Sequence, residues 1–271
     1  MSAIGLTHAR RLPRALRSAF RGPRRTQVAA DEQLKLVDHL GELRRRLVIS
    51  SSSLLVGFVG VFLVHTELIA LLNEPLNGLK PVTLGVAEPF MTAVKVSFMG
   101  AIGIALPILL WQLWGFIAPA CEAKWRRSVA GYVATGTILF ITGVTFAYII
   151  ALPQAVGFLI NFDSQLYDVQ VRAQEYYTFA AAVLLSVGLV FQLPVVLVSL
   201  VRFRVLKYET LRSNRRIAYV ALVGLAVLMP GVDPVTTSMW IVPLAIFYEV
   251  SILLARRWDK QRIKREALAS S

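Results

Sequence analysis

The sequence is poor in the side chains that enzymes use for nucleophilic or metal chemistry. It contains a single cysteine, Cys121, and three histidines, His8, His39 and His65. One cysteine excludes an intramolecular disulfide. The histidines are scattered, and no HExxH, CxxC, GxSxG or P-loop pattern occurs. We therefore expect a protein that is not an enzyme, that binds no metal or cofactor, and that does not itself hydrolyse ATP.

Acidic residues are also scarce. The chain has 16 Asp and Glu against 29 Lys and Arg, which gives a net charge of +13, yet only 17% of its residues are charged. Hydrophobic residues make up 56% of the 271, and the mean hydropathy is +0.62. A soluble domain of this length could not bury so much apolar surface, so the composition indicates an integral membrane protein.

Long apolar segments, by contrast, recur along the chain. They cover residues 47–64, 94–118, 129–152, 180–201, 217–229 and 239–255. Pro107 should kink the second segment. The fifth is short, because a helix of about 13 residues covers about 20 Å whereas the hydrocarbon core is about 30 Å thick. We predict an all-α membrane protein with six transmembrane helices, of which the last two are short.

The basic residues indicate how such a chain would cross the membrane. Of the 29 Lys and Arg, all except Lys80, Lys95 and Arg172 lie in the two tails or in the second and fourth loops. The remaining loops carry seven of the 16 acids, for example Glu67 and Glu88, against those three basic residues. The positive-inside rule then predicts six spans with both termini in the cytoplasm. This placement explains the +13 charge without a nucleic-acid partner.

The charge pattern also suggests a division of the chain. We expect a basic cytoplasmic tail at 1–33, a membrane domain at 34–258 and a second basic tail at 259–271. The first tail is expected to be disordered, although a short interfacial helix on anionic lipid and an organellar transit peptide are alternatives. Two longer loops, at about 64–93 and 153–179, are polar enough to form structured caps.

Two polar side chains fall inside apolar segments. Glu249 lies within two turns of Arg256, so we expect it to be paired near the cytoplasmic edge. Gln192 precedes Pro194, which cannot donate to the carbonyl of Val190, so the amide either compensates locally or has a functional role. These groups suggest an alternative function, a six-span proton-coupled secondary transporter of a small solute. Two groups are few for an ion relay, and no internal repeat is evident.

A basic amphipathic stretch precedes the first apolar segment. Leucines recur at helical spacing on one face, at Leu36, Leu40, Leu43 and Leu47. We expect a helix on the membrane surface that runs directly into the first span. Glu42 is a carboxylate among arginines there. It could form an ion pair with Arg45 or Arg46, worth about 0.2–0.5 kcal/mol, or it could receive a cationic ligand.

Several short stretches, taken in order, point to one family. They are HLGELRRR at 39–46, NEPL at 73–76, EPF at 88–90, KVSFM at 95–99, Pro107 with QLWGFIAP at 112–119, FQLP at 191–194 and MPGVDP at 229–234. Together they cover about residues 34–258 and resemble the TatC family, the multi-spanning receptor subunit of the twin-arginine protein translocase. No single motif is decisive, but their order is specific.

The resemblance implies a fold and a function. It implies a cupped bundle of six transmembrane helices in the bacterial plasma membrane. Such a protein binds the twin-arginine signal peptides of folded cargo, works with TatA-type and TatB-type single-span subunits, and uses the proton-motive force. It also implies contact with membrane lipid and a homo-oligomer within the receptor complex.

The resemblance further assigns roles to individual residues. Signal-peptide binding falls to Glu42, Arg44 and Arg46. Translocation or partner contact falls to Pro75, Lys95, Phe116, Gln192 and Asp233.

The chain departs from the family pattern in one loop. The family usually has a second glutamate in a stretch like PGLxxxERR, whereas Trp125 stands at that position here and Glu122 is the only acid of the loop. We hypothesise that Glu122 substitutes from one turn earlier. Alternatively, Trp125 holds an arginine by a cation–π contact of about 0.5–2 kcal/mol. If neither holds, recognition depends on Glu42 alone.

Overall fold

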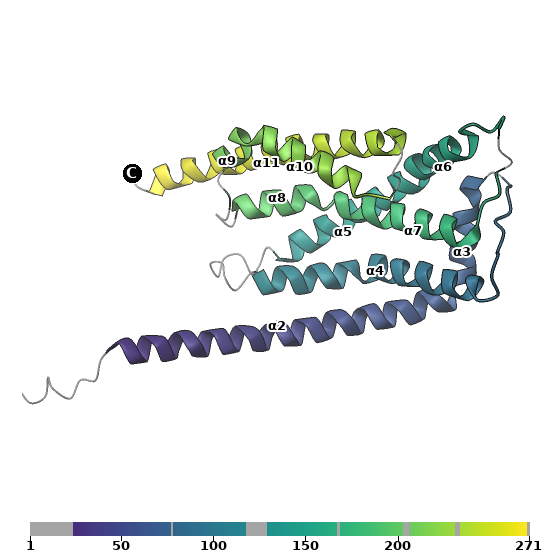
Figure 1. Ribbon diagram of the computed structural model, residues 1–271. Helices are drawn as coiled ribbons and strands as arrows, with labels where there is room; N and C mark the ends of the chain where they lie inside the picture. The colour runs from purple at the N-terminus through teal and green to yellow at the C-terminus, as the bar shows by residue number, and fades with distance from the viewer. Residues whose placement is uncertain are drawn as a thin grey trace, which may run out of the picture. The chain divides into compact units, whose positions relative to one another are not determined.

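The computed structural model describes residues 24–76, 78–117, 129–166, 169–202, 206, 208–230 and 234–269. The helices are α2 (Arg24–Leu63), α3 (His65–Asn73), η1 (Glu74–Leu76), α4 (Glu88–Ile117), α5 (Val129–Phe146), η4 (Ala147–Ala151), α6 (Leu152–Asn161), α7 (Ala173–Val190), α8 (Leu193–Arg202), α9 (Tyr208–Ser213), α10 (Arg215–Val227) and α11 (Pro234–Ala269) (Figure 1). The described part of the chain is therefore almost entirely helical, as predicted.

Contacts within the chain divide it into two compact units, Met1–Leu47 and Val48–Ser271. Helix α2 is continuous across the boundary, with 40 residues from Arg24 to Leu63. The predicted basic helix and the first apolar segment are thus one helix, which confirms the expected continuity. Residues 1–23 of the predicted basic tail lie outside the described residues.

Four stretches of described helix are long and apolar enough to cross a membrane. They are His39–Leu63, Glu88–Ile117, Val129–Asn161 and Ala173–Arg202. They correspond in order to the first four predicted segments. The predicted fifth segment is α10, whose 13 residues confirm that it is short.

The last helix differs from its prediction. Helix α11 has 36 residues, from Pro234 to Ala269, and so is not short. The apolar segment predicted within it ends at 255, but the helix continues into the basic residues that follow. Lys, Arg and Glu are good helix formers, so a loss of hydropathy does not end the hydrogen-bonding pattern.

Three prolines lie within or at the start of helices in the long apolar stretches. Pro107 lies inside α4, which continues through it as one helix. Pro153 stands in the first turn of α6 and lacks the N–H that would bond the carbonyl of Ile149. The five-residue π-helical segment η4 immediately precedes α6. A π-helical turn is a common way for a helix to accommodate a missing backbone hydrogen bond. Pro194 similarly opens α8 after the break that ends α7.

The core of the Val48–Ser271 unit is built around α7, which packs against both α4 and α5. Glycines allow these helices to approach closely. A Cβ atom at Gly188 would overlap the ring of Phe140, and one at Gly143 would lie 2.7 Å from the ring of Phe191. Small residues at helix contacts are the usual basis of close packing in membrane proteins.

The two long loops are structured and joined to each other. The first contains α3 and η1, as predicted for a structured cap, whereas α6 at the start of the second continues the long apolar stretch Val129–Asn161. Val82 of the first loop forms a bridge with Arg172 of the second. The bridge consists of two backbone bonds of 2.8 Å, from Val82 N to Val171 O and from Ala173 N to Val82 O.

Candidate functional site

Glu42 lies in the Met1–Leu47 unit, on the part of α2 that carries the HLGELRRR motif. Arg46 Nε donates to Glu42 Oε1 at 3.0 Å, and Arg46 Nη2 donates to the same oxygen at 2.6 Å. The Glu42 side chain is 33% exposed. Of the ion pairs considered from the sequence, the pair with Arg46 is therefore the one that forms. Arg44 and Arg45 are exposed on the same helix.

Glu88 belongs to a buried ion-pair cluster that the sequence reasoning did not identify. It opens α4, where a negative charge favours the helix N-terminus, yet the residue is only 4% exposed. It accepts bonds from Leu84 N at 3.0 Å, Gln174 N at 3.2 Å and Arg172 Nε at 3.1 Å. A carboxylate can be buried in this way because its charge is paired and hydrogen-bonded.

Arg172 is the cationic partner in this cluster. Besides Glu88, it donates to Glu175 Oε1 at 3.1 Å. The hydrogen bond to Glu88 raises the pKa of the Arg172 guanidinium above its ordinary value. The sequence did carry a signal for the cluster, because Arg172 is one of only three cations outside the basic segments. An isolated cation in an acidic loop indicates a partner.

Pro75 lies in η1, in a corner of the first loop held by three tyrosine hydroxyls. The Tyr148 hydroxyl lies 3.1 Å from Leu71 O and 2.5 Å from Glu74 Oε2 and donates to both. The Tyr176 hydroxyl donates to Leu72 O at 2.5 Å. The Tyr177 hydroxyl donates to Asn73 Oδ1 at 2.7 Å. These tyrosines come from η4 and α7. The loop before Pro75 is therefore fixed to two other helical segments.

Lys95 and Phe116 both lie on α4 but are far apart along it. Lys95 is exposed in its second turn and Phe116 is half-buried near its C-terminal end. Twenty-one residues separate them, or about 32 Å at 1.5 Å per residue. These two described residues therefore do not share a pocket. Glu122, Trp125 and Asp233 lie outside the described residues.

Gln192 is buried at the break between α7 and α8. Its Nε2 donates to the carbonyl of Gly136 on α5 at 3.0 Å. Of the two alternatives for Gln192, local compensation for Pro194 is not what the amide does, because it bonds across to another helix. A Cβ atom at Gly136 would lie 2.9 Å from Gln192 Oε1, so the glycine makes room for this contact.

Glu249 is paired, but with a different residue from the one expected. Arg215 Nη2 on α10 donates to its Oε2 at 3.1 Å, and the Tyr219 hydroxyl donates to its Oε1 at 2.7 Å. The sequence had suggested Arg256, one or two turns away on the same helix. The actual partners join α10 to α11. Glu249 and Gln192 are thus held by different partners on different helices.

The chain matches known proteins over most of its length. The family model described as Sec-independent protein translocase protein (TatC) matches residues 38–243. TatC of Desulforapulum autotrophicum is 34% identical over 245 residues, which cover 89% of this chain and 91% of that protein. TatC of Carboxydothermus hydrogenoformans is 33% identical over 229 residues, which cover 83% and 94%.

Solved structures agree with these relatives. The crystal structure of the twin-arginine translocase receptor TatC in DDM superposes with a TM-score of 0.73 at 31% identity, covering 80% of this chain and 99% of that one. A second crystal structure of this receptor gives a TM-score of 0.72 at 30% identity, with 80% and 98% covered. These matches confirm the predicted family and favour a translocase component over the small-solute transporter and over an enzyme. The chain belongs to the TatC family of Sec-independent protein translocase proteins.

Proposed function

We propose that this protein binds the twin-arginine signal peptides of folded proteins and helps to move that cargo across the membrane with the proton-motive force. Its family membership supports this function over a small-solute transporter. TatA-type and TatB-type single-span proteins are the proposed partners, and several copies of the chain are proposed to assemble in the receptor complex.

The observation that carries the proposal is the partly exposed Glu42 carboxylate on α2. Arg46 Nε and Nη2 both bond the Oε1 atom of this carboxylate. We infer that a signal-peptide arginine binds at Oε2, either beside Arg46 or by replacing it. A planar guanidinium matches a carboxylate in two-bond geometry, and a charge-assisted hydrogen bond contributes about 1.5–3 kcal/mol.

The neighbouring arginines supply selectivity in this proposal. Arg44 is exposed beside Glu42, and Arg46 is its ion-pair partner. Their positive charge repels a cation that does not reach the carboxylate, so only a ligand that places its arginines correctly gains from binding. Glu122 or Trp125 is the proposed contact for the second arginine of the pair.

The other assigned residues are proposed to serve translocation or partner contact. Pro75 shapes a corner that tyrosines hold in place. Lys95 is exposed on α4, and Phe116 and Asp233 are assigned by resemblance. Gln192 joins the α7–α8 break to α5, so its proposed contribution is to set the position of that break.

The proposed topology has six spans in the bacterial plasma membrane with both termini in the cytoplasm. Helices α10 and α11 supply the fifth and sixth spans beside the four long apolar stretches. The distribution of the 29 basic residues supports this orientation.

Export of a folded reporter behind a twin-arginine signal tests the function. We expect cells that lack this gene to retain the reporter in the cytoplasm, and the full-length chain to restore export. A reporter whose signal carries two lysines is the matched control and should stay inside. Normal export in the cells that lack the gene would contradict the proposal.

A further inference from the structure

An apolar cavity of about 520 Å³ opens within the Val48–Ser271 unit. It lies between the end of α2 and helices α3, α4, α5 and α7, and its walls include Val61, Met99, Phe140 and Leu185. Among the described residues that line it, Glu67 is the one with a charged side chain. Among the residues described by the structure, Pro75, Lys95, Phe116 and Gln192 are not part of its lining.

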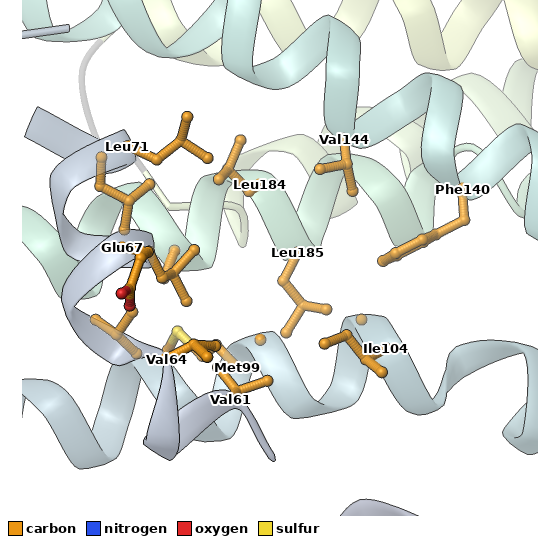
Figure 2. Close-up of a pocket in the computed structure, with 16 residues that line it drawn as sticks. Val61, Val64, Glu67, Leu71, Met99, Ile104, Phe140, Val144, Leu184 and Leu185 are labelled. Carbon is orange, nitrogen blue, oxygen red and sulfur yellow. The ribbon is translucent and has the colours of Figure 1, made fainter. Parts of the chain in front are cut away.

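The cavity is elongated, with the charge at one end. Figure 2 shows Glu67 on α3 at one end, and Ile104 and Phe140 at the other. On α4 the lining runs from Val96 to Ile104, which is about 12 Å at 1.5 Å per residue. Its shape is therefore that of an apolar slot with a carboxylate at one end.

Glu67 is held in its charged form. The hydroxyl of Thr66 donates to Oε2 at 2.8 Å, and this bond, with the backbone and with His65, lowers the pKa of the Glu67 carboxyl. Glu67 is also exposed, in the first turn of the short helix α3. A cationic group can therefore reach it from outside the protein.

The volume limits what can enter the slot. A helix is about 10–12 Å across, so a 30 Å length of it fills more than about 2,000 Å³, several times the cavity. A single hydrocarbon chain is thin enough to enter it. In a bilayer the available hydrocarbon chains belong to lipids.

We propose that this cavity binds one acyl chain of a phospholipid whose ammonium headgroup pairs with Glu67. Phosphatidylethanolamine has this chemistry, because its primary ammonium donates hydrogen bonds to a carboxylate. Phosphatidylglycerol offers the same chains and phosphate without the cation. The carboxylate thus selects the headgroup, while the apolar walls hold the chain.

The first test uses the full-length chain in nanodiscs with phosphatidylethanolamine that carries a photoreactive diazirine on its acyl chain. We expect labelled peptides to map to the cavity walls, around Val61 and Met99, and labelling to exceed that by the matched phosphatidylglycerol severalfold. Glu67→Gln should remove this preference, and Glu209→Gln, which changes an exposed carboxylate on α9, should keep it. Equal labelling by both lipids, or an unchanged preference in Glu67→Gln, overturns the headgroup assignment.

The second test fills the cavity. A Cβ atom at Gly103 would lie 3.6 Å from the Phe140 ring, an ordinary contact, so Gly103→Ala should keep labelling. Gly103→Leu should reduce it at least fivefold, because the longer side chain occupies the slot. Val144→Phe fills the same space from α5 and serves if Gly103→Leu does not fold. Full labelling of a Gly103→Leu or Val144→Phe protein that folds would overturn the site. The site would also be overturned if labelling showed no preference between the two lipids and a twin-arginine signal peptide competed with it.

Discussion

Arg172 and Glu88 are 84 positions apart in the sequence, yet Arg172 Nε lies 3.1 Å from Glu88 Oε1. The pair stands next to the Val82–Arg172 bridge. Side-chain and backbone bonds thus fasten the two long loops at the same place. We infer that this fastening fixes the start of α4 against the start of α7.

Glu88→Gln should lower the thermal unfolding midpoint of the detergent-purified protein by a few degrees. The change removes the charge from a buried group that accepts four bonds and leaves Arg172 with a weaker partner. Glu175→Gln is the matched control, because Glu175 bonds the same arginine from a side chain that is 73% exposed. Equal midpoints for the two variants would mean that the buried pair adds nothing to stability.

Gly136→Ala should reduce the free energy of unfolding by about 1–3 kcal/mol, the usual cost of overpacking. The new Cβ would lie 2.8 Å from Leu110 Cδ1 and 2.9 Å from Gln192 Oε1. Gly131→Ala on the same helix meets nothing within 4 Å and should stabilise by about 0.5–1 kcal/mol through helix propensity. Denaturation of both variants measures the difference. A neutral Gly136→Ala would argue against the close packing of Gln192 on α5.

Tyr176→Phe should loosen the corner that contains Pro75. It removes the hydroxyl that donates to Leu72 O, a bond worth about 0.5–1.5 kcal/mol. Amide hydrogen exchange should rise in residues 71–76, while exchange in α10 stays the same. Unchanged exchange in the corner would show that the other two tyrosines suffice to hold it.

The pair between Arg215 and Glu249 predicts a charge-swap result. Arg215→Glu and Glu249→Arg should each destabilise the contact between α10 and α11, because each places like charges together. The double swap should recover most of the loss, measured by thermal unfolding. The recovered energy should be small, about 0.2–1 kcal/mol, since both side chains are partly exposed. Additive losses in the double variant would exclude a direct pair.

Features set by local sequence could be predicted. The 13-residue length of α10 follows from the length of its apolar segment. The ion pair of Glu42 with Arg46 follows from helical spacing of four residues. Helix α11 was predicted too short, because hydropathy falls where its basic residues begin while helix propensity does not.

Contacts between distant segments could not be predicted in the same way. The partner of Gln192 is 56 residues away at Gly136, and the partner of Glu249 is 34 residues away at Arg215. Periodicity and charge counts describe one helix at a time and do not say which helices meet. For that reason the local sequence suggests neither Gly136 for Gln192 nor Arg215 for Glu249.

The central claim is that Glu42 holds a signal-peptide arginine. Photocrosslinking of a twin-arginine signal peptide to the membrane-inserted chain tests it most directly. We predict that Glu42→Gln reduces crosslinking about tenfold or more, as loss of a charge-assisted bond of about 1.5–3 kcal/mol requires, while insertion is unchanged. Glu209→Gln should crosslink like the unaltered chain. Full crosslinking of a correctly inserted Glu42→Gln protein would contradict the account and leave Glu42 only its ion pair with Arg46.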